Sequence, residues 1–313
     1  MEYAAYIFKR LVTLIPVLFG ISVLVFFLIH LVPGDPAKTL LGSHVTDQAV
    51  AELHHKLGLD KPLWQQYLTF LGRLLHGDLG ESYQYNTSVS SLVWHDLAPT
   101  LWLIVVGAVF AVLISVPLAV WAASRQNKLA DNAIRTIPLI GLGMPAFWLG
   151  IMLVLLLSLK AGAFPASGFG DGFANHVKSI ILPALTVALA LVPILVRSLR
   201  ASMLRVLQSD YVVTARSKGI STSRVVLRHA LRNAAISSIT VLGVNIAYLI
   251  GSTLVVEKVF ALNGIGFLMI TAIFNRDFPI VQGVTLTFAV MVVVVNLMTD
   301  LAHAALDPRV RLT

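Results

Sequence analysis

The sequence predicts an all-α polytopic membrane protein with six transmembrane helices and with both termini in the cytoplasm. Three observations support this fold class. Of the 313 residues, 57% are hydrophobic and only 12% are charged, whereas soluble domains carry about 25% charged residues. Six apolar stretches approach the length of about 20 residues that a helix needs to cross a hydrocarbon core about 30 Å thick. Lys and Arg are also unevenly distributed between the two sides that these stretches define.

The six predicted spans are Leu11–Leu31, Leu101–Ala123, Ile134–Leu159, Ser179–Val196, Ala235–Val256 and Ile280–Leu301. The third and fourth contain prolines, which a membrane bundle tolerates because neighbouring helices satisfy the freed backbone groups. Lys9 and Arg10 before the first span resemble the start of a secretory signal. However, the apolar run is longer than the core of about 7–15 residues in such signals, and no small-residue cleavage site follows. We therefore expect a retained anchor.

The charge balance predicts the orientation of these spans. The side that would hold both termini carries 15 Lys and Arg, while the opposite side carries 8 together with ten acids. Cytoplasmic loops of membrane proteins are rich in Lys and Arg, so both termini are predicted to be cytoplasmic. The net charge of +8 is then explained by topology, and no nucleic-acid partner is expected.

The largest external segment, Val32–Pro99, is predicted to contain an amphipathic helix. In the stretch PLWQQYLTFLGRLL, apolar residues recur at helical spacing. Gly and Asp turn signals follow it in HGDLGESYQYN. Two compatible interpretations stay open: a cap packed over the external membrane face, or a docking surface for an external partner.

A second external segment, Glu257–Pro279, is unusually apolar for a loop. Its stretch IGFLMITAIF is too short to cross a bilayer and is typical of an interfacial or re-entrant helix. Such a helix either closes the mouth of a pathway or fills space between spans. On the first interpretation, the candidate gate residues are Gly264, Gly266, Phe267, Met269 and Phe274.

The chain carries no sign of its own energy source or chemistry. It has no cysteine, no phosphate-binding G-x-x-x-x-G-K-[ST] motif, no H-E-x-x-H metal pair and no G-x-S-x-G elbow. Asp300 is the only acid inside a predicted span, whereas proton-coupled carriers bury ionisable residues as relays. We therefore expect no catalytic residue, no metal site and no cofactor bound by this chain.

The run from Asp210 to Ala234 is strongly basic and predicts two helices joined at a glycine. Ser209 or Asp210 is suited to cap the first helix, and Gly219 is suited to end it in the left-handed conformation. Ser221 is suited to cap the second helix, with Ile220 able to pack against Val225. The first helix contains the apolar, β-branched stretch YVVTA, which predicts a surface for it to lie against.

The second helix places three arginines four residues apart, Arg224, Arg228 and Arg232. One interpretation of this stripe is contact with anionic lipid headgroups. The other is a device in which a short helix, fixed by a glycine corner to the next span, receives mechanical input from a cytoplasmic partner.

The run resembles the cytoplasmic loop of permease subunits in binding-protein-dependent ABC importers. The signature of that loop is Glu-Ala-Ala, three residues, Gly and then a basic stretch. Ala215 corresponds to the last alanine and Gly219 to the glycine, while Val213 and Thr214 replace the first two motif residues. Arg232 stands at the usual proline position.

Further segments are similar to the dipeptide/oligopeptide branch of that family, and to its B-type subunit in particular. They are PGDPA (Pro33–Ala37), LGLDKPLWQQY (Leu57–Tyr67), GDLGES (Gly77–Ser82), RDFPIVQG (Arg276–Gly283) and LDPRVR (Leu306–Arg311). The resemblance covers essentially the whole chain. A nickel branch shares most of these features.

The resemblance implies the type I ABC importer transmembrane-domain fold. It divides the chain into an N-terminal anchor helix with an extracytoplasmic segment (1–98), a transmembrane domain with five spans (99–303) and a cytoplasmic tail (304–313). A coupling loop is expected at 199–234 inside the transmembrane domain.

The resemblance also implies a function and a set of partners. The chain is expected to be the permease subunit of an ATP-driven importer in the bacterial inner membrane, forming the pathway for dipeptides or oligopeptides without being an enzyme. Its expected partners are a homologous C-type permease subunit, two cytoplasmic ATPase subunits that use ATP and Mg, an extracytoplasmic peptide-binding protein and membrane lipids. The ATPase-coupling residues are expected to be Asp210, Tyr211, Thr214, Ala215, Arg216, Lys218, Gly219, Ser221, Arg224, Arg228 and Arg232.

Two other hypotheses compete with this one. A stand-alone channel or secondary carrier would use the basic loop only to set its topology. A membrane scaffold would have no pathway at all. Within the leading hypothesis, a non-peptide substrate such as a nickel complex is the alternative to peptides.

Overall fold

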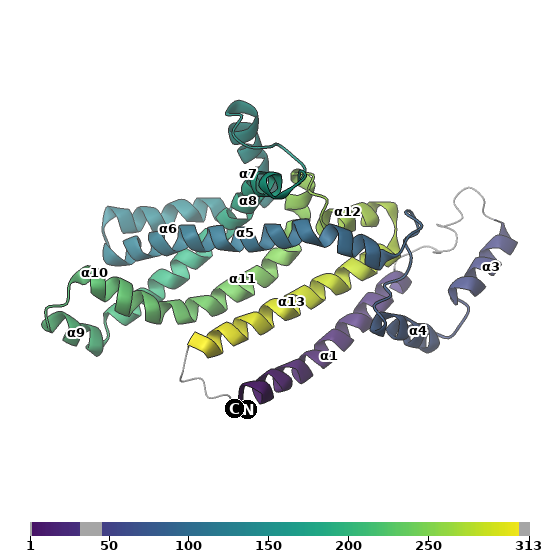
Figure 1. The fold of residues 1–313 in the computed structure, drawn as a ribbon, viewed down its shortest axis with the longest axis horizontal. Helices are drawn as coiled ribbons and strands as arrows, with labels where there is room; N and C mark the ends of the chain where they lie inside the picture. Colours follow the sequence, from purple (N-terminus) through teal and green to yellow (C-terminus); the bar gives the residue numbers. More distant parts are fainter. Residues whose placement is uncertain (1, 32–45, 307–313) are drawn as a thin grey trace. The chain divides into compact units, whose positions relative to one another are not determined.

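The computed structural model describes residues 2–31 and 46–306, and this part of the chain is helical, as predicted, with one isolated β-bridge between Glu81 and Ser88. The motif PGDPA and most of LDPRVR lie outside the described residues. The elements are α1 (Glu2–Leu31), α3 (Asp47–Leu57), α4 (Leu63–Leu75), α5 (Val89–Ser124), α6 (Leu129–Leu142), α7 (Ala146–Leu153), η1 (Val154–Lys160), α8 (Phe173–Leu207), α9 (Asp210–Ser217), α10 (Thr222–Arg224), η2 (Val225–Leu231), α11 (Arg232–Val259), α12 (Ile265–Asn275) and α13 (Phe278–Leu306), where η denotes a π-helix (Figure 1).

Four of the described helices are long and apolar enough to cross a membrane. They are α5, α8, the Ser238–Val259 part of α11 and the Phe278–Ala305 part of α13. The second, fourth, fifth and sixth predicted spans lie in these helices. The first predicted span lies in α1, where the apolar stretch among the described side chains is the shorter Val12–Phe27.

The third predicted span is not one continuous helix. Helix α6 ends at Leu142, and α7 begins at Ala146 after a break that contains Gly143 and Pro145. Pro145 is the N-cap of α7, with extended backbone angles of φ −60° and ψ 140°. Proline disfavours a helical residue before it but is well tolerated at the start of a new helix, because it lacks only an N–H that would be unpaired there. The break therefore follows from the sequence GMPA.

The described chain forms two compact units, which are considered one at a time. The first consists of Met1–Ala98 and Gly264–Met291, and the second of Pro99–Asn263 and Val292–Thr313. In the first unit, a core joins the start of α5 to α12 and the start of α13 through buried side chains that include Val89, Ile265 and Ile280.

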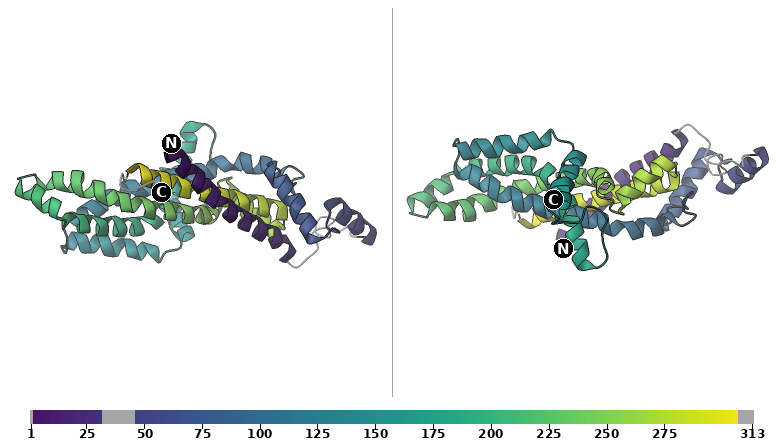
Figure 2. Two further views of the ribbon diagram at one scale, coloured as in Figure 1. Left: turned by 90° about the horizontal axis from the view of Figure 1, so that it is seen from below. Right: turned by 90° about the horizontal axis from the view of Figure 1, so that it is seen from above.

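In the second unit, α8 is the central helix and packs against α6, α7 and α11 (Figures 1 and 2). Within its most apolar stretch, 72% of the residues are buried, against 28–33% in the other three long helices. A helix that is covered on all sides forms the core of its unit. Gly150 of α7 permits close packing there, since a Cβ at this position would lie 3.0 Å from the ring of Phe260.

Candidate functional site

The predicted helix–glycine–helix unit is present in the 199–234 loop, and its first helix is α9. Ser209 stands at the N-cap position with extended backbone angles, but its hydroxyl donates to the carbonyl of Val206 instead of capping α9. The side-chain cap expected from Ser209 is therefore absent. Thr214 and Ser217 also direct their hydroxyls back to carbonyls of α9, those of Asp210 and Val213. The helix is held by its own backbone and by what it packs against.

Gly219 ends α9 in the left-handed conformation, with φ +76°, as predicted. Its N–H donates to the carbonyl of Arg216 at 2.9 Å, and the N–H of Ile220 donates to that of Ala215 at 3.2 Å. These two bonds form a Schellman motif, which satisfies the last free carbonyls of a helix. A Cβ at position 219 would meet no atom within 4 Å. The requirement for glycine is therefore conformational and not steric.

The loop has two arms: the first is α9, and the second is α10 with η2, after Gly219. A small apolar core joins the two arms. Val212 and Val225 are fully buried, Ala215 is 9% exposed, and Ile220 packs against them. The predicted contact of Ile220 with Val225 is part of this core. Ala215 therefore faces the second arm, and the surface of α9 is formed by other residues.

The exposed surface of α9 contains two large apolar side chains. Tyr211 is 46% exposed and Val213 is 55% exposed, and Thr214, Arg216 and Lys218 are exposed as well. The Tyr211 hydroxyl accepts a hydrogen bond of 3.0 Å from Nδ2 of Asn233, near the start of α11. This bond and the small core hold α9 against the second arm and the start of α11. Part of the apolar surface of α9 therefore lies against the second arm, while Tyr211 and Val213 stay exposed.

The second arm begins with Ser221 at the N-cap of α10, without a side-chain capping bond, and then becomes the π-helix η2 before it continues as α11. The sequence predicted a regular helix and did not indicate the π-helical segment. Arg224, Arg228 and Arg232 are all exposed. Short π-helical segments are rare and occur frequently at functional sites.

A buried ion pair fixes the part of α8 that leads into this loop. Arg200 donates from Nε to Oδ1 of Asp131 and from Nη2 to Oδ2, each at 2.6 Å. The side chain of Asp131 is fully buried and that of Arg200 is 14% exposed. Asp131 also accepts the N–H of Asn127 at 2.9 Å. The pair thus connects α8, α6 and the turn before α6, and sequence reasoning missed it because 69 residues separate its members.

The five candidate gate residues lie on or next to α12, which forms the short apolar helix that was predicted. Gly264 and Gly266 are buried, Phe267 and Met269 are partly buried, and Phe274 is 83% exposed. The structure therefore distributes them around the helix and does not bring all five to one surface.

Asp277, between α12 and α13, binds the loop before α5 in the first unit, and sequence reasoning missed this contact. It is 1% exposed, and its Oδ2 accepts hydrogen bonds from Ser82 Oγ at 2.6 Å and from the N–H of Gln84 at 3.0 Å. Burial raises the pKa of the neighbouring Tyr83 to about 12, and the charge of Asp277 adds to this effect. The bonds of Asp277 hold the loop before α5 against the start of α13.

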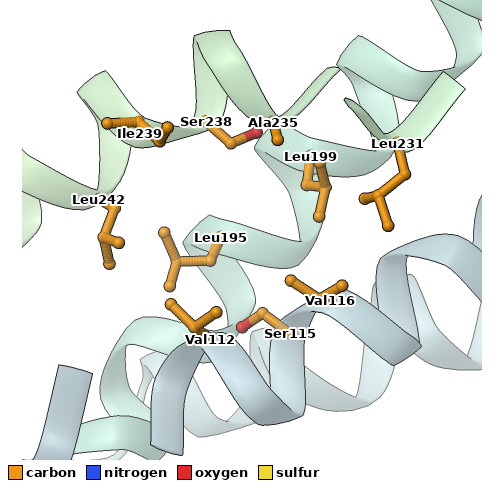
Figure 3. Close-up of a pocket in the computed structure, with 10 residues that line it drawn as sticks. All are labelled: Val112, Ser115, Val116, Leu195, Leu199, Leu231, Ala235, Ser238, Ile239 and Leu242. Atoms are coloured by element: carbon orange, nitrogen blue, oxygen red, sulfur yellow. The ribbon is translucent and has the colours of Figure 1, made fainter. Parts of the chain in front are cut away.

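An apolar cavity of about 120 Å³ lies in the second unit between α5, α8, the end of η2 and α11 (Figure 3). It is lined by Val112, Ser115, Val116, Leu195, Leu199, Leu231, Ala235, Ser238, Ile239 and Leu242. Within the part of the chain that the structure describes, the buried hydroxyl of Ser115 has no hydrogen-bond partner. Apart from Ser115 and Ser238, the residues that line the cavity are apolar. Among the described residues, no group of three His, Cys, Asp or Glu is placed to bind a metal ion.

The long apolar helices define a multi-pass membrane protein. Residues 115–312 match the protein family described as "Binding-protein-dependent transport system inner membrane component". Residues 3–104 match the family that describes the N-terminal region of such components. The chain therefore belongs to the family of inner membrane components of binding-protein-dependent transport systems. It is a multi-pass protein of the bacterial inner membrane.

Comparison with individual proteins supports the same family assignment. The chain is 38% identical over 306 residues to the glutathione transport system permease protein GsiC of Escherichia coli O6:H1, covering 98% of each chain. It has the same identity and coverage with GsiC of Salmonella choleraesuis. An inward-facing structure of the MetNI methionine ABC transporter matches with a TM-score of 0.57 and 17% identity, over 69% of this chain and 96% of that chain. The last match shows the fold alone, which is that of an ABC importer permease.

Proposed function

We propose that this chain is the permease subunit of an ATP-driven importer and forms the membrane pathway for short peptides of the size of glutathione. The observation that carries the proposal is the 38% identity to a glutathione permease along 98% of both chains. Such a match extends over the external segment, the spans and the loop, and is not confined to one motif. The substrate is therefore a peptide and not a nickel complex.

The proposed topology has six spans and cytoplasmic termini. The unequal distribution of Lys and Arg supports it, and so do the four long apolar helices. Helix α1 supplies the first span, and α6 with α7 and η1 supplies a broken third span, which is acceptable where neighbouring helices cover the freed backbone groups. The segments 1–98, 99–303 and 304–313 are the proposed anchor with its external segment, the transmembrane domain and the tail.

The proposed partners are a C-type permease subunit, two ATPase subunits and an external peptide-binding protein. The ATPases would hold ATP and Mg, and this chain would bind neither. The exposed side chains Tyr211 and Val213 support an ATPase contact at α9, because apolar side chains of this size are stabilised by a covering surface.

The geometry of the loop supports a mechanism of transmission. A force on α9 would pass through the core of Val212, Ala215 and Val225 into the second arm and α11. The same force would pass through α8 to the Asp131–Arg200 pair and so to α6. Both routes consist of packed or hydrogen-bonded contacts, so α9 would move the ends of three spans together. Interfaces of this kind shift between discrete arrangements when partners close.

The test is uptake of radiolabelled glutathione into proteoliposomes that contain the chain, its co-purified subunits and the binding protein. Uptake is expected only with ATP inside the compartment that holds the ATPases, and is expected to stop when those ATPases are inactivated. A short dipeptide should compete with the label, whereas nickel salts should not. Uptake by the purified chain alone, without any ATPase, would contradict the proposal and support a stand-alone carrier.

A further inference from the structure

We propose that α4 lies in the outer leaflet of the membrane, beside the C-terminal half of α1, with its outer face in contact with lipid. The outer face is defined here as Trp64, Leu68 and Leu75. This inference does not depend on the transport activity. It assigns a lipid-binding role to a helix that the sequence left open as a cap or as a docking surface for an external protein.

Helix α4 carries a broad apolar surface and a separate polar one. Residues four or seven positions apart lie on one face of a helix, which places Trp64, Leu68 and Leu75 together. Gln65, Thr69 and Arg73 follow the same spacing on another face. An amphipathic helix with one strongly apolar side is typical of helices that lie in the plane of a membrane surface.

Only part of the apolar surface is covered by α1. The ring of Tyr67 lies 5.3 Å from that of Phe26 and 6.2 Å from that of Phe19, and the ring of Phe70 lies 5.9 Å from Phe26. The hydroxyls of Tyr67 and Ser22 are 2.9 Å apart and hydrogen-bonded. Aromatic pairs at these distances prefer the edge-to-face arrangement that two of them adopt. These contacts fix α4 to the side of α1 within the first unit.

The contacts place α4 at the depth of the membrane. Phe26 and Ser22 stand five and nine residues before Leu31, which corresponds to about 8 and 14 Å along a helix axis. Both belong to the apolar stretch Val12–Phe27. The hydrocarbon core is about 30 Å thick. A helix that contacts α1 at these positions therefore lies within the bilayer.

The outer face has the composition of a lipid contact. Trp64 is 62% exposed, Leu68 56% and Leu75 79%, and no residue of α4 is buried. On α1 itself, the apolar side chains of Phe19 and Leu24 are also exposed, at 54% and 71%. Trp favours the membrane interface, where its ring is in an apolar layer and its N–H meets water. Lipid is therefore the occupant, in preference to a soluble protein.

The experiment uses the absence of cysteine from this chain. Leu68→Cys gives one labelling site on the outer face, and Thr69→Cys gives an exposed matched site on the polar face, one residue away. Each variant is labelled with the fluorophore NBD in the assembled complex, after the accessible cysteines of the other subunits are replaced by serine. The complex is then reconstituted in phosphatidylcholine and phosphatidylglycerol vesicles that contain doxyl-labelled lipid.

The Leu68 probe is expected to emit at shorter wavelength and to be quenched by doxyl lipid at least about three-fold more strongly than the Thr69 probe. Iodide in the water phase should show the opposite preference. Equal quenching of both probes by iodide would overturn the proposal, because the outer face would then be in water. Protection of the Leu68 probe from both quenchers would overturn it as well, because a protein subunit would then cover the face. Leu75→Cys repeats the measurement at a second position of the outer face.

Discussion

At the scale of single residues, position 219 has the clearest requirement for a particular amino acid, which is glycine. Its φ of +76° is a conformation that residues with a Cβ avoid, at a cost of about 1–2 kcal/mol. Gly219→Ala is therefore expected to distort the corner while the spans stay folded. We expect peptide uptake in proteoliposomes to fall several-fold, with the ATPase subunits still able to hydrolyse ATP.

Gly77 provides a matched control for this prediction. It has φ +74°, and, like Gly219, a Cβ on it would meet no atom within 4 Å. Gly77→Ala therefore imposes the same backbone cost outside the 199–234 loop. If both substitutions lowered uptake equally, the effect would be one of general stability, and the role assigned to the corner would be wrong.

Ala215 and Val213 are two neighbouring apolar positions with opposite environments. Ala215 is 9% exposed inside the small core, whereas Val213 is 55% exposed. Ala215→Leu is expected to overpack the core at a cost of about 1–3 kcal/mol, and to separate α9 from the second arm. Limited trypsin digestion should then cleave after Arg216 several-fold faster than in the unmodified chain.

Val213→Leu is the control, because an extra methylene on an exposed side chain changes stability little, by roughly 0.5 kcal/mol or less. Its rate of cleavage after Arg216 should match that of the unmodified chain. Faster cleavage in Val213→Leu than in Ala215→Leu would show that Val213, and not Ala215, lies in the small core.

At the scale of elements, the Asp131–Arg200 pair joins α8 to α6. Removing one member of a buried pair costs about 3–5 kcal/mol, because the other charge is left without a partner. Asp131→Ala should therefore lower the melting temperature and the number of peptides imported per ATP hydrolysed. The exchange Asp131→Arg with Arg200→Asp should recover part of both losses. Asp60→Asn, which breaks an exposed contact with His55, should change neither quantity.

The same elements show which parts of the structure were predictable from the sequence. The corner at Gly219 and the contact of Ile220 with Val225 were predicted because their signals lie within a few residues of each other. The Asp131–Arg200 and Ser82–Asp277 contacts join residues 69 and 195 positions apart. A single sequence contains no signal that pairs such distant residues, so these contacts could not be found.

Two local features were missed for different reasons. Hydrophobicity placed 134–159 in one span without locating the break between α6 and α7, for which Gly143 and Pro145 are local signals. The π-helix η2 has an ordinary helical sequence, and what distinguishes it is its packing, with Val225, Val226 and Ala230 buried. Periodicity identified the helix there but not its hydrogen-bond pattern.

At the scale of the whole molecule, the chain divides its roles between two units. The first unit contains α1, the external segment, α12 and the Asp277 contacts, and the second contains the central α8 and the 199–234 loop. Helices α5 and α13 contribute residues to both units. On the proposed function, the ATPase contact is confined to the second unit, while the external segment belongs to the first.

This division predicts where the ATPase subunits protect the chain. Arg216 and Lys218 are exposed next to the apolar side chains Tyr211 and Val213, and the ATPase would cover all four. Trypsin cleavage after these two basic residues is therefore expected to slow at least about five-fold when purified ATPase subunits are added to the chain in detergent. Cleavage after Arg276, which is exposed in the turn between α12 and α13 of the first unit, should keep its rate and serves as the internal control. Equal protection at all three sites would indicate non-specific association, and no protection at Arg216 and Lys218 would place the ATPase contact elsewhere.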